Sequence, residues 1–473
     1  MLFILHFAAL AAVTLVSPGE IQVQSQMAGE VTPSGVILQA RIVSAEGPRN
    51  PQSAGIECEG HFELWTGETF AQPLKTKSVS STESNDYFIK VAVDGLTADT
   101  RYSYRLVLRT VKGRQYGSIG TFRTLSPDSV QPVSFVVVTG MNYDHFHLGR
   151  NGKAANAYTG PDRELGYPAL ASILDLRPDF FVGTGDNVYY DRLDSHIART
   201  RSEMRAKWHQ QFAQARFQEL FAIVPTYWEK DDHDYRLNDS DPFNNGAPSH
   251  IDGIEVFREQ LPVTNPADPQ AKTYRTHRLT KHAQIWLPEG RDFRSANGMP
   301  DGPTKTLWGA EQERWLRESL LASDATFKII IHPTPMVGPD DAYKRDNHVN
   351  HRGFRREGDD FFAWLKRSKL EDVYVICGDR HWQYHSIHSS GVEEFSCGAL
   401  VDANARKGRK PGDPASTDPE GLTEQPYIQA RASGGFLRVT VEEHDRSPTA
   451  RFQFFDEQGT LQYEVTRSPT DED

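Results

Sequence analysis

Acidic and histidine residues gather in four short segments of the chain that each follow an apolar, β-branched run. Carboxylates and imidazoles are metal ligands, and a crowded set of them needs a cation to offset repulsion and lost solvation. A pair of ions held in this way can activate water and neutralise the charge that develops at phosphorus. The segments are 183–191 (GTGDNVYYD), 230–234 (KDDHD), His332 and 378–381 (GDRH).

The runs ahead of these segments are typical of strands that are buried on both faces. Helical patterns separate them, and strands alternating with helices predict an α/β sheet with helices on both faces. The carboxyl ends of such strands converge on one crevice, so the four segments can meet there. We expect strands at 133–138, 180–184, 223–228, 327–331 and 373–377, helices at 165–174, 195–220, 311–321 and 359–367, and antiparallel additions at 436–441 and 450–455.

In the first part of the chain the apolar residues follow a different pattern. Short alternating runs separated by turn residues extend over residues 21–125, which predicts an antiparallel β-sandwich. Leu96 and Tyr102, six residues apart, resemble the corner of fibronectin type III domains. We therefore divide the chain into a fibronectin-like sandwich at 20–126 and a catalytic domain at 130–473, and expect the catalytic domain to carry the chemistry without the sandwich.

The N-terminus predicts export. Residues 1–17 form an apolar segment that is too short to span a bilayer comfortably and matches the core of a signal peptide. We expect a secreted or periplasmic protein whose mature chain has no stable membrane span. The net charge of −12 argues against nucleic acid as the main partner, because phosphate backbones need a basic surface.

The order of three motifs carries a family resemblance. Gly-Asp-x-x-Tyr at 185–189, Asp-Asp-His-Asp at 231–234 and Gly-Asp-Arg-His at 378–381 resemble the alkaline phosphatase D (PhoD-like) family of metallophosphatases, and 289–294 (EGRDFR) with 312–316 (QERWL) agrees with it. The resemblance covers about residues 130–400. It implies an α/β fold, the layered metallophosphatase fold with mixed β-sheets flanked by helices, preceded by an all-β sandwich.

The resemblance also implies a ligand set. Asp186 would bridge two metal ions, and Tyr189 would bind as a phenolate, which favours Fe³⁺. Asp232 and Asp379 would bind the second ion, and His381 would bind the first. The expected cofactors are therefore two metal ions, Fe³⁺ plus a divalent ion such as Ca²⁺, Zn²⁺, Mn²⁺ or Fe²⁺.

Further positions would act on the substrate. His233 matches a histidine that contacts the phosphoryl oxygen or protonates the leaving group. Arg380, Arg291 and Arg294 are candidate oxyanion contacts, because a guanidinium fork fits phosphate. Ion pairing with neighbouring carboxylates is the rival interpretation for each of these arginines.

Two positions depart from the family pattern. The first motif usually offers Asp or Cys, whereas here Asn142 falls at that position, with Asp144, His145 and His147 as nearby alternatives. His332 stands where many members have an amide or another residue. If His332 binds, the second site gains nitrogen and favours a transition metal over Ca²⁺.

The resemblance implies a secreted metal-dependent phosphoric ester hydrolase, of the alkaline phosphatase or phosphodiesterase type, in which a metal-bound hydroxide attacks a small-molecule phosphate ester. One alternative keeps the site and changes the substrate to a sulfate ester or a phospholipid-type diester. Another is a non-catalytic secreted binding protein with a degenerate metal site, which the altered first motif favours. Loops such as 339–356 carry no readable substrate code.

Overall fold

The computed structural model describes residues 21–44, 53–67, 69, 72–111, 113–150, 153, 156–191 and 197–470. The predicted signal peptide at 1–17 lies outside these residues. Within the described part of the chain, none of the helices has the length and apolar character needed to cross a membrane.

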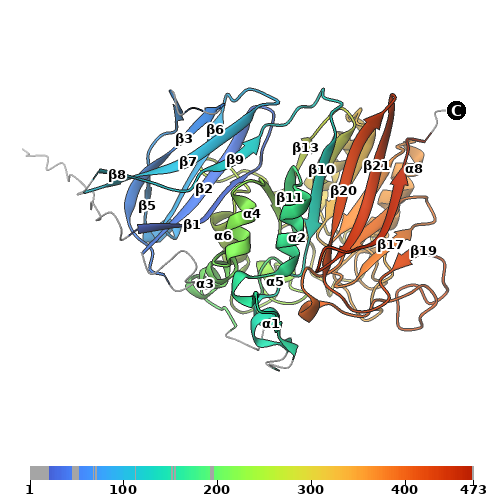
Figure 1. Cartoon of the computed structure of the whole chain (residues 1–473). Helices are drawn as coiled ribbons and strands as arrows, with labels where there is room; N and C mark the ends of the chain where they lie inside the picture. The colour runs from blue at the N-terminus through green and yellow to red at the C-terminus, as the bar shows by residue number, and fades with distance from the viewer. Residues whose placement is uncertain are drawn as a thin grey trace, which may run out of the picture.

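Two large mixed sheets form the centre of the molecule (Figure 1). The first has nine strands, in the order β22 (Leu461–Arg467), β21 (Ser447–Asp456), β20 (Gly435–His444), β10 (Val133–Val138), β11 (Phe180–Thr184), β12 (Thr226–Glu229), β1 (Ile21–Gly29), β2 (Gly35–Ser44) and β6 (Phe88–Asp94). The second has seven, in the order β13 (Arg275–Arg278), β14 (Ala283–Leu287), β15 (Phe327–His332), β16 (Val373–Cys377), β18 (Glu393–Cys397), β17 (Gln383–Ile387) and β19 (Glu424–Ile428).

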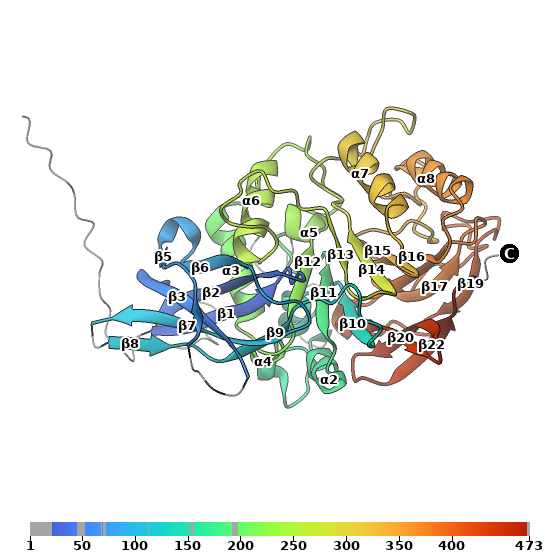
Figure 2. The ribbon, with the colours of Figure 1, turned by 90° about the horizontal axis from the view of Figure 1, so that it is seen from above.

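The two sheets pack face to face, and helices cover their outer faces. Along β10, Phe135 and Val137 join an apolar cluster shared with the second sheet, whereas Val136 and Val138 join the cluster beneath the helices. This alternation follows from the two-residue period of a strand and makes both faces of β10 apolar. Figure 2 shows α7 and α8 beside β14–β16, on the side away from β10 and β20.

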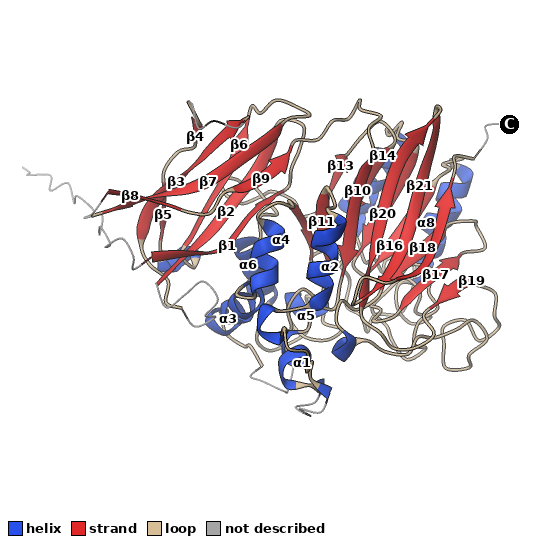
Figure 3. Ribbon diagram, viewed as in Figure 1, coloured by secondary structure: helices blue, strands red, loops and turns tan. Residues whose placement is uncertain are grey.

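The helices include those predicted, with several boundaries shifted. The stretch expected to be one helix at 195–220 contains two, separated near Ala213, and the helix expected from residue 359 begins at 355. Figure 3 shows how the helices lie relative to the strands. They are α1 (Tyr143–Leu148), α2 (Pro168–Leu176), α3 (Arg201–Phe212), α4 (Ala215–Phe221), α5 (Asp232–Tyr235), α6 (His250–Gln260), α7 (Gly309–Leu321) and α8 (Arg355–Arg367).

The N-terminal region is all-β, as predicted. Its second layer contains β4 (Leu74–Lys75), β3 (Cys58–Thr66), β7 (Arg101–Thr110) and β8 (Gly113–Tyr116), with β5 (Val79–Ser81) on β3 and β9 (Gly120–Arg123) on β7. The hydroxyl of Tyr102 accepts a hydrogen bond from the backbone N–H of Thr97 (2.9 Å), which pins the corner before β7.

The N-terminal region does not stand apart from the catalytic region, because β1 pairs in parallel with β12 and extends the first sheet. The hydroxyl of Tyr227 also donates to the backbone oxygen of Val31 (2.7 Å). Glu30, 8% exposed, forms an ion pair with Arg275 (2.5 Å) and contacts His277 Nε2 (3.0 Å). These contacts indicate that residues 130–473 alone would be less stable, and the expectation that they carry the chemistry without the sandwich stays a prediction.

We predict that a chain beginning at residue 130 unfolds at a lower temperature than the full chain and aggregates. Its β12 edge would lose its partner strand, and Arg275 would be left without its buried carboxylate. Thermal unfolding followed by light scattering checks this. Glu30→Gln in the full chain should have an intermediate effect, lowering the free energy of unfolding by about 3 kcal/mol. A monomeric truncation as stable as the full chain would contradict the prediction.

Candidate metal centre

The site forms where strand ends of both large sheets meet. Asp186 follows β11, Asp232 follows β12 and Asp379 follows β16. Glycines permit the close approach: a Cβ at Gly378 would lie 2.4 Å from the backbone oxygen of Thr184, so a larger residue could not fit there. Asp186 and Asp379 have left-handed backbone φ angles of 53° and 54°, which turn each chain sharply at its strand end.

Asp186 lies at the centre of one group of polar atoms. Its Oδ2 accepts a hydrogen bond from the hydroxyl of Tyr189 (2.8 Å) and lies 3.0 Å from His381 Nε2. The Tyr189 oxygen and His381 Nε2 are 3.3 Å apart. Asn404 Nδ2 donates to the Tyr189 oxygen (2.7 Å), an interaction that would also stabilise a phenolate. The structure thus brings together Asp186, Tyr189 and His381, as predicted for one ion.

A second group adjoins the first. Asp231, Asp232 and Asp379 offer carboxylate oxygens that all lie within 4.8 Å of one another, and Asp186, Asp232 and His233 form an equally close set. All these residues are buried. The predicted ligands Asp232 and Asp379 are therefore neighbours, and Asp231 joins them although it was not predicted.

The electrostatics of this cluster favour cations. Burial raises the pKa of Asp186 and of Asp231 well above the ordinary value, because ionised carboxylates so close together lack solvation. Asp186 Oδ1 and Asp231 Oδ2 are buried without a hydrogen-bond partner. Orphaned carboxylate oxygens beside an imidazole and a phenol suit metal ions, so the residues present fit the pair of ions that the sequence predicts.

His233 is oriented by a carboxylate outside the cluster. Its Nδ1 lies 2.7 Å from Asp191 Oδ1, while the other Asp191 oxygen accepts the backbone N–H of Asn238 (2.7 Å). A carboxylate acceptor places a proton on Nδ1, and a ring nitrogen of His233 lies within 4.8 Å of oxygens of Asp186 and Asp232. The His233 ring packs on Tyr189, with ring centroids 4.4 Å apart.

The arginines expected to contact an oxyanion are instead bound within the protein. Arg291 is fully buried and donates from Nε to Asp231 Oδ1 (2.7 Å) and from Nη1 to the Ser240 backbone oxygen (3.0 Å). Arg380, equally buried, pairs with Asp340 and Asp379. This geometry favours the rival interpretation, in which both arginines are counterions of the cluster's carboxylates.

Arg294 follows the same pattern. It donates from Nε to the Gly290 backbone oxygen (2.7 Å) and from Nη1 to the Asp346 backbone oxygen (3.0 Å). Its Nη2 has no partner. Burial lowers the pKa of Arg294 to about 10. Its side chain holds the loop around residue 346 in place.

The structure does not bring His332 into the cluster. Trp308 Nε1–H donates to His332 Nε2 (3.0 Å), and His332 Nδ1 lies 2.6 Å from the Thr334 backbone oxygen. Because Nε2 accepts, the proton is on Nδ1, and both nitrogens are engaged. The expectation that His332 is a metal ligand is therefore not supported.

Asn142 follows β10, close to Asp186, whose backbone oxygen accepts the N–H of Met141 (2.9 Å). The Oδ1 of Asn142 caps helix α1 by accepting the backbone N–H of His145 (2.9 Å). A ligand role for Asn142 would use the second lone pair of this oxygen. His145 Nδ1 contacts Asn404 Oδ1 (3.0 Å) and so fixes the amide that reaches Tyr189.

Several residues of the site were not identified from the sequence. Asp234 ties two loops together, since its Oδ1 accepts the backbone N–H of Asp231 (2.7 Å) and its Oδ2 accepts from the side chain of Asn187 (2.6 Å). Asp231 and Asp234 lie in the motif at 231–234, which was their only sequence signal. Asn404 and Lys344 come from loops without such a signal.

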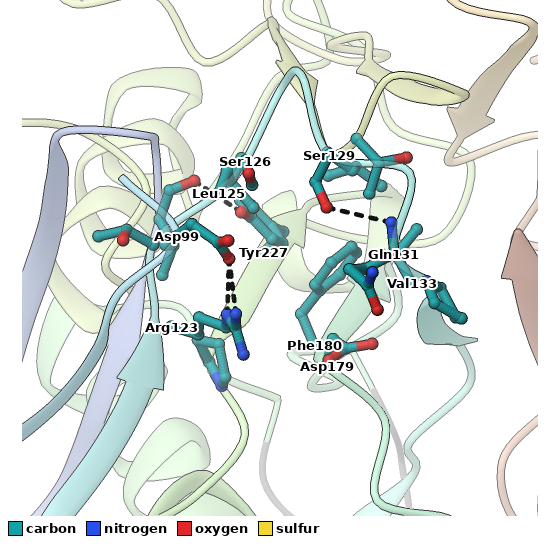
Figure 4. A pocket seen from close by; sticks show the side chains of 16 residues that line it. Asp99, Arg123, Leu125, Ser126, Ser129, Gln131, Val133, Asp179, Phe180 and Tyr227 are labelled. Carbon is teal, nitrogen blue, oxygen red and sulfur yellow. Dashed lines mark hydrogen bonds and ion pairs between the residues drawn. The ribbon is translucent and has the colours of Figure 1, made fainter. Parts of the chain in front are cut away.

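A cavity of about 360 Å³ lies elsewhere, at the opposite ends of the same strands (Figure 4). Its walls include Val133 and Phe180, which begin β10 and β11, and an Arg123–Asp99 ion pair (2.7 Å) stands at its border. None of the cluster's carboxylates lines it. We therefore assign the chemistry to the carboxylate cluster and not to this cavity.

The fold is that of metallophosphatases. A solved structure of PhoD superposes with a TM-score of 0.73 at 18% identity, covering 96% of this chain and 91% of the other. The purple acid phosphatase PPD1 from yellow lupin (Lupinus luteus) seeds superposes with a TM-score of 0.62 at 13% identity, covering 94% and 74%. Both predicted features, the mixed sheets flanked by helices and the all-β N-terminal region, are confirmed.

The family follows from the sequence match. Residues 135–452 match the model of the PhoD-like phosphatase family, and residues 20–126 match that of its N-terminal domain. Alkaline phosphatase D of Bacillus subtilis (strain 168) is 22% identical over 423 residues, which cover 81% of this chain and 69% of the relative. The chain belongs to the PhoD-like phosphatase family and is a metal-dependent phosphoester hydrolase.

The position of Tyr189 makes a spectroscopic prediction. If its oxygen binds Fe³⁺, the iron-loaded protein should have a visible charge-transfer band, and Tyr189→Phe should abolish the band. Tyr190→Phe is the matched control, because the Tyr190 hydroxyl points away and accepts from Trp208 Nε1 (2.6 Å). Absorption spectra with iron analysis measure this. An iron-replete wild type without the band would exclude Tyr189 ligation.

Proposed function

We propose that the chain is an extracytoplasmic phosphatase or phosphodiesterase with a binuclear metal centre. Asp186, Tyr189 and His381 would hold one ion, with Asn142 as a further candidate. Asp186 would bridge to a second ion held by further carboxylates, namely Asp232, Asp379 and the unpredicted Asp231. The observation that carries the proposal is the convergence of these ligand atoms, with orphaned carboxylate oxygens, at strand ends that are distant in sequence.

The two ions, when bound, supply an activated water nucleophile and neutralise charge on the phosphoryl group. The protein's own contribution is to position them and to handle the leaving group. His233 has its Nδ1 fixed by Asp191 and belongs to the close set with Asp186 and Asp232, which suits proton donation to the leaving oxygen. The apolar segment at 1–17 supports export, and the choice of Fe³⁺ rests on Tyr189.

The substrate remains a small phosphate ester, with a sulfate ester or a phospholipid-type diester as the alternatives that use the same site. We expect phosphomonoester and phosphodiester chromogens to be cleaved by the metal-loaded protein, and sulfate-ester chromogens to be cleaved at least about 100-fold more slowly. Equal or faster sulfate-ester cleavage would overturn this substrate class.

Asp186→Asn tests the metal centre. The variant should lose more than about 100-fold in kcat and bind fewer metal ions, because the bridging carboxylate is replaced by a neutral amide. Asp179→Asn is the matched control at the other end of β11, where Asp179 accepts the backbone N–H of Ser134 (2.7 Å). Steady-state rates and elemental analysis measure both. Normal turnover by Asp186→Asn would exclude the binuclear proposal.

Asp191→Asn tests the proton donor. Burial acts to lower the pKa of His233, but Asp191, Asp232 and Asp186 outweigh it and raise the pKa to about 10. A general acid is active when protonated, so activity falls as pH rises through the pKa of His233, which the charge of Asp191 raises. Asp191 is not a proposed ligand, so its charge remains effective when metals bind.

Removing that charge should move the alkaline limb of kcat/KM down by about one pH unit and lower kcat by about 10–100-fold. The matched control is Glu443→Gln, which removes the carboxylate 2.8 Å from His282 at the start of β14. Rate–pH profiles of the two variants measure the effect. An unshifted alkaline limb in Asp191→Asn would exclude His233 as the donor.

A further inference from the structure

Lys344 places an ammonium group inside the acidic cluster. Its Nζ is bonded to Asp239 Oδ1 and lies 3.9 Å from Asp346 Oδ1, and its side chain is only 6% exposed. Asp232, Asp239 and Asp346 offer oxygens within 4.8 Å of one another, a set that would attract a cation. Lys344 is thus a cation supplied by the chain itself, in contact with the carboxylates beside the proposed second ion.

Lys344 lies close to the proposed metal ligands. Asp232 Oδ2 accepts the backbone N–H of Asp239 (2.6 Å), so the residue that holds Lys344 also holds a proposed ligand. Burial raises the pKa of Asp379, and the positive charges of Arg380 and Lys344 oppose that rise. A phosphoryl group that reached the ions at Asp232 and Asp379 would therefore lie near Lys344.

The cluster's arginines are less suited to contact a phosphoryl group. Arg291 is held by Asp231 and by the Ser240 backbone oxygen, and Arg380 by Asp340 and Asp379, all of them with no more than 5% of their surface exposed. The partner of Lys344 differs, because the Asp239 side chain is 35% exposed. An anion arriving from solvent meets the Lys344–Asp239 pair and can replace Asp239 as the acceptor.

We propose that Lys344 binds a non-bridging oxygen of the substrate's phosphoryl group, with Asp239 holding its ammonium in place until the substrate arrives. An ammonium is a compact charge with three donors, so it can keep Asp346 nearby while it turns from Asp239 to the phosphoryl oxygen. This inference rests on the proposed function, because it adds a substrate-binding residue to the same site.

The test uses the metal-loaded full chain and inorganic phosphate as the probe. Lys344→Met should weaken phosphate binding at least about 10-fold, measured by calorimetry and as a competitive inhibition constant, and raise KM by a similar factor. Metal content should stay as in the wild type, and circular dichroism should show that the variant is folded at the assay temperature. Lys344→Arg keeps the charge and should recover part of the affinity. Arg345→Met, which removes an exposed charge from the same loop, should leave phosphate binding within about twofold.

Asp239→Asn should change the affinity for phosphate in the opposite direction to Lys344→Met. Removing the competing carboxylate should strengthen phosphate binding several-fold without loss of metal. Unchanged phosphate binding in Lys344→Met, an equal loss in Arg345→Met, or weaker phosphate binding in Asp239→Asn would each overturn the proposal. Calorimetry with phosphate keeps this result separate from the proposed function, since a wild type that cleaves no ester can still be titrated.

Discussion

The structure depends on one electrostatic constraint, the burial of several carboxylates where two sheets meet. Asp186, Asp231, Asp232 and Asp379 come from three strand ends and are each no more than 5% exposed. Ionised carboxylates at this spacing repel one another and lack the water that would solvate them. Such a cluster would lower stability unless cations offset it. The arrangement therefore suits metal ions, whose positive charge would offset this repulsion.

The protein offsets part of this charge without metals. Arg291 and Arg380 pair with cluster carboxylates, and both guanidinium groups are fully buried. Lys344 lies on the side of the half-exposed Asp239. The buried guanidinium groups and the ammonium of Lys344 therefore have separate roles. The buried arginines fix the direction of ligand oxygens, as outer partners of metal ligands generally do, while the charge that pairs with the more exposed Asp239 is an ammonium with three donors.

The sequence predicted the parts of the fold and site that local patterns specify. Runs apolar on both faces located β10, β11 and β16, and the segments after β11 and β16 contain Asp186, Tyr189 and Asp379, whose roles as ligands the family resemblance implied. What it could not predict depends on contacts between distant segments. Whether a buried arginine faces substrate or a carboxylate is decided by Asp340 and Asp346, which lie in a loop with no periodic pattern. His332 follows its strand as a ligand would, but its ring is turned toward Trp308.

The N-terminal sandwich shows that a domain boundary indicated by the sequence need not separate two structural units. Its alternating pattern and the linker after residue 126 predict a separate unit, yet parallel pairing of β1 with β12 makes one sheet of both. β12 would otherwise be an unpaired edge, and it is the strand that delivers Asp231 and Asp232. An edge strand frays more readily than a central one. Adding β1 and the buried Glu30–Arg275 pair therefore stiffens the strand whose end must hold carboxylates within a few tenths of an ångström of productive positions. We therefore expect the sandwich to affect catalysis through the position of β12, although it supplies no ligand among the described residues of the cluster.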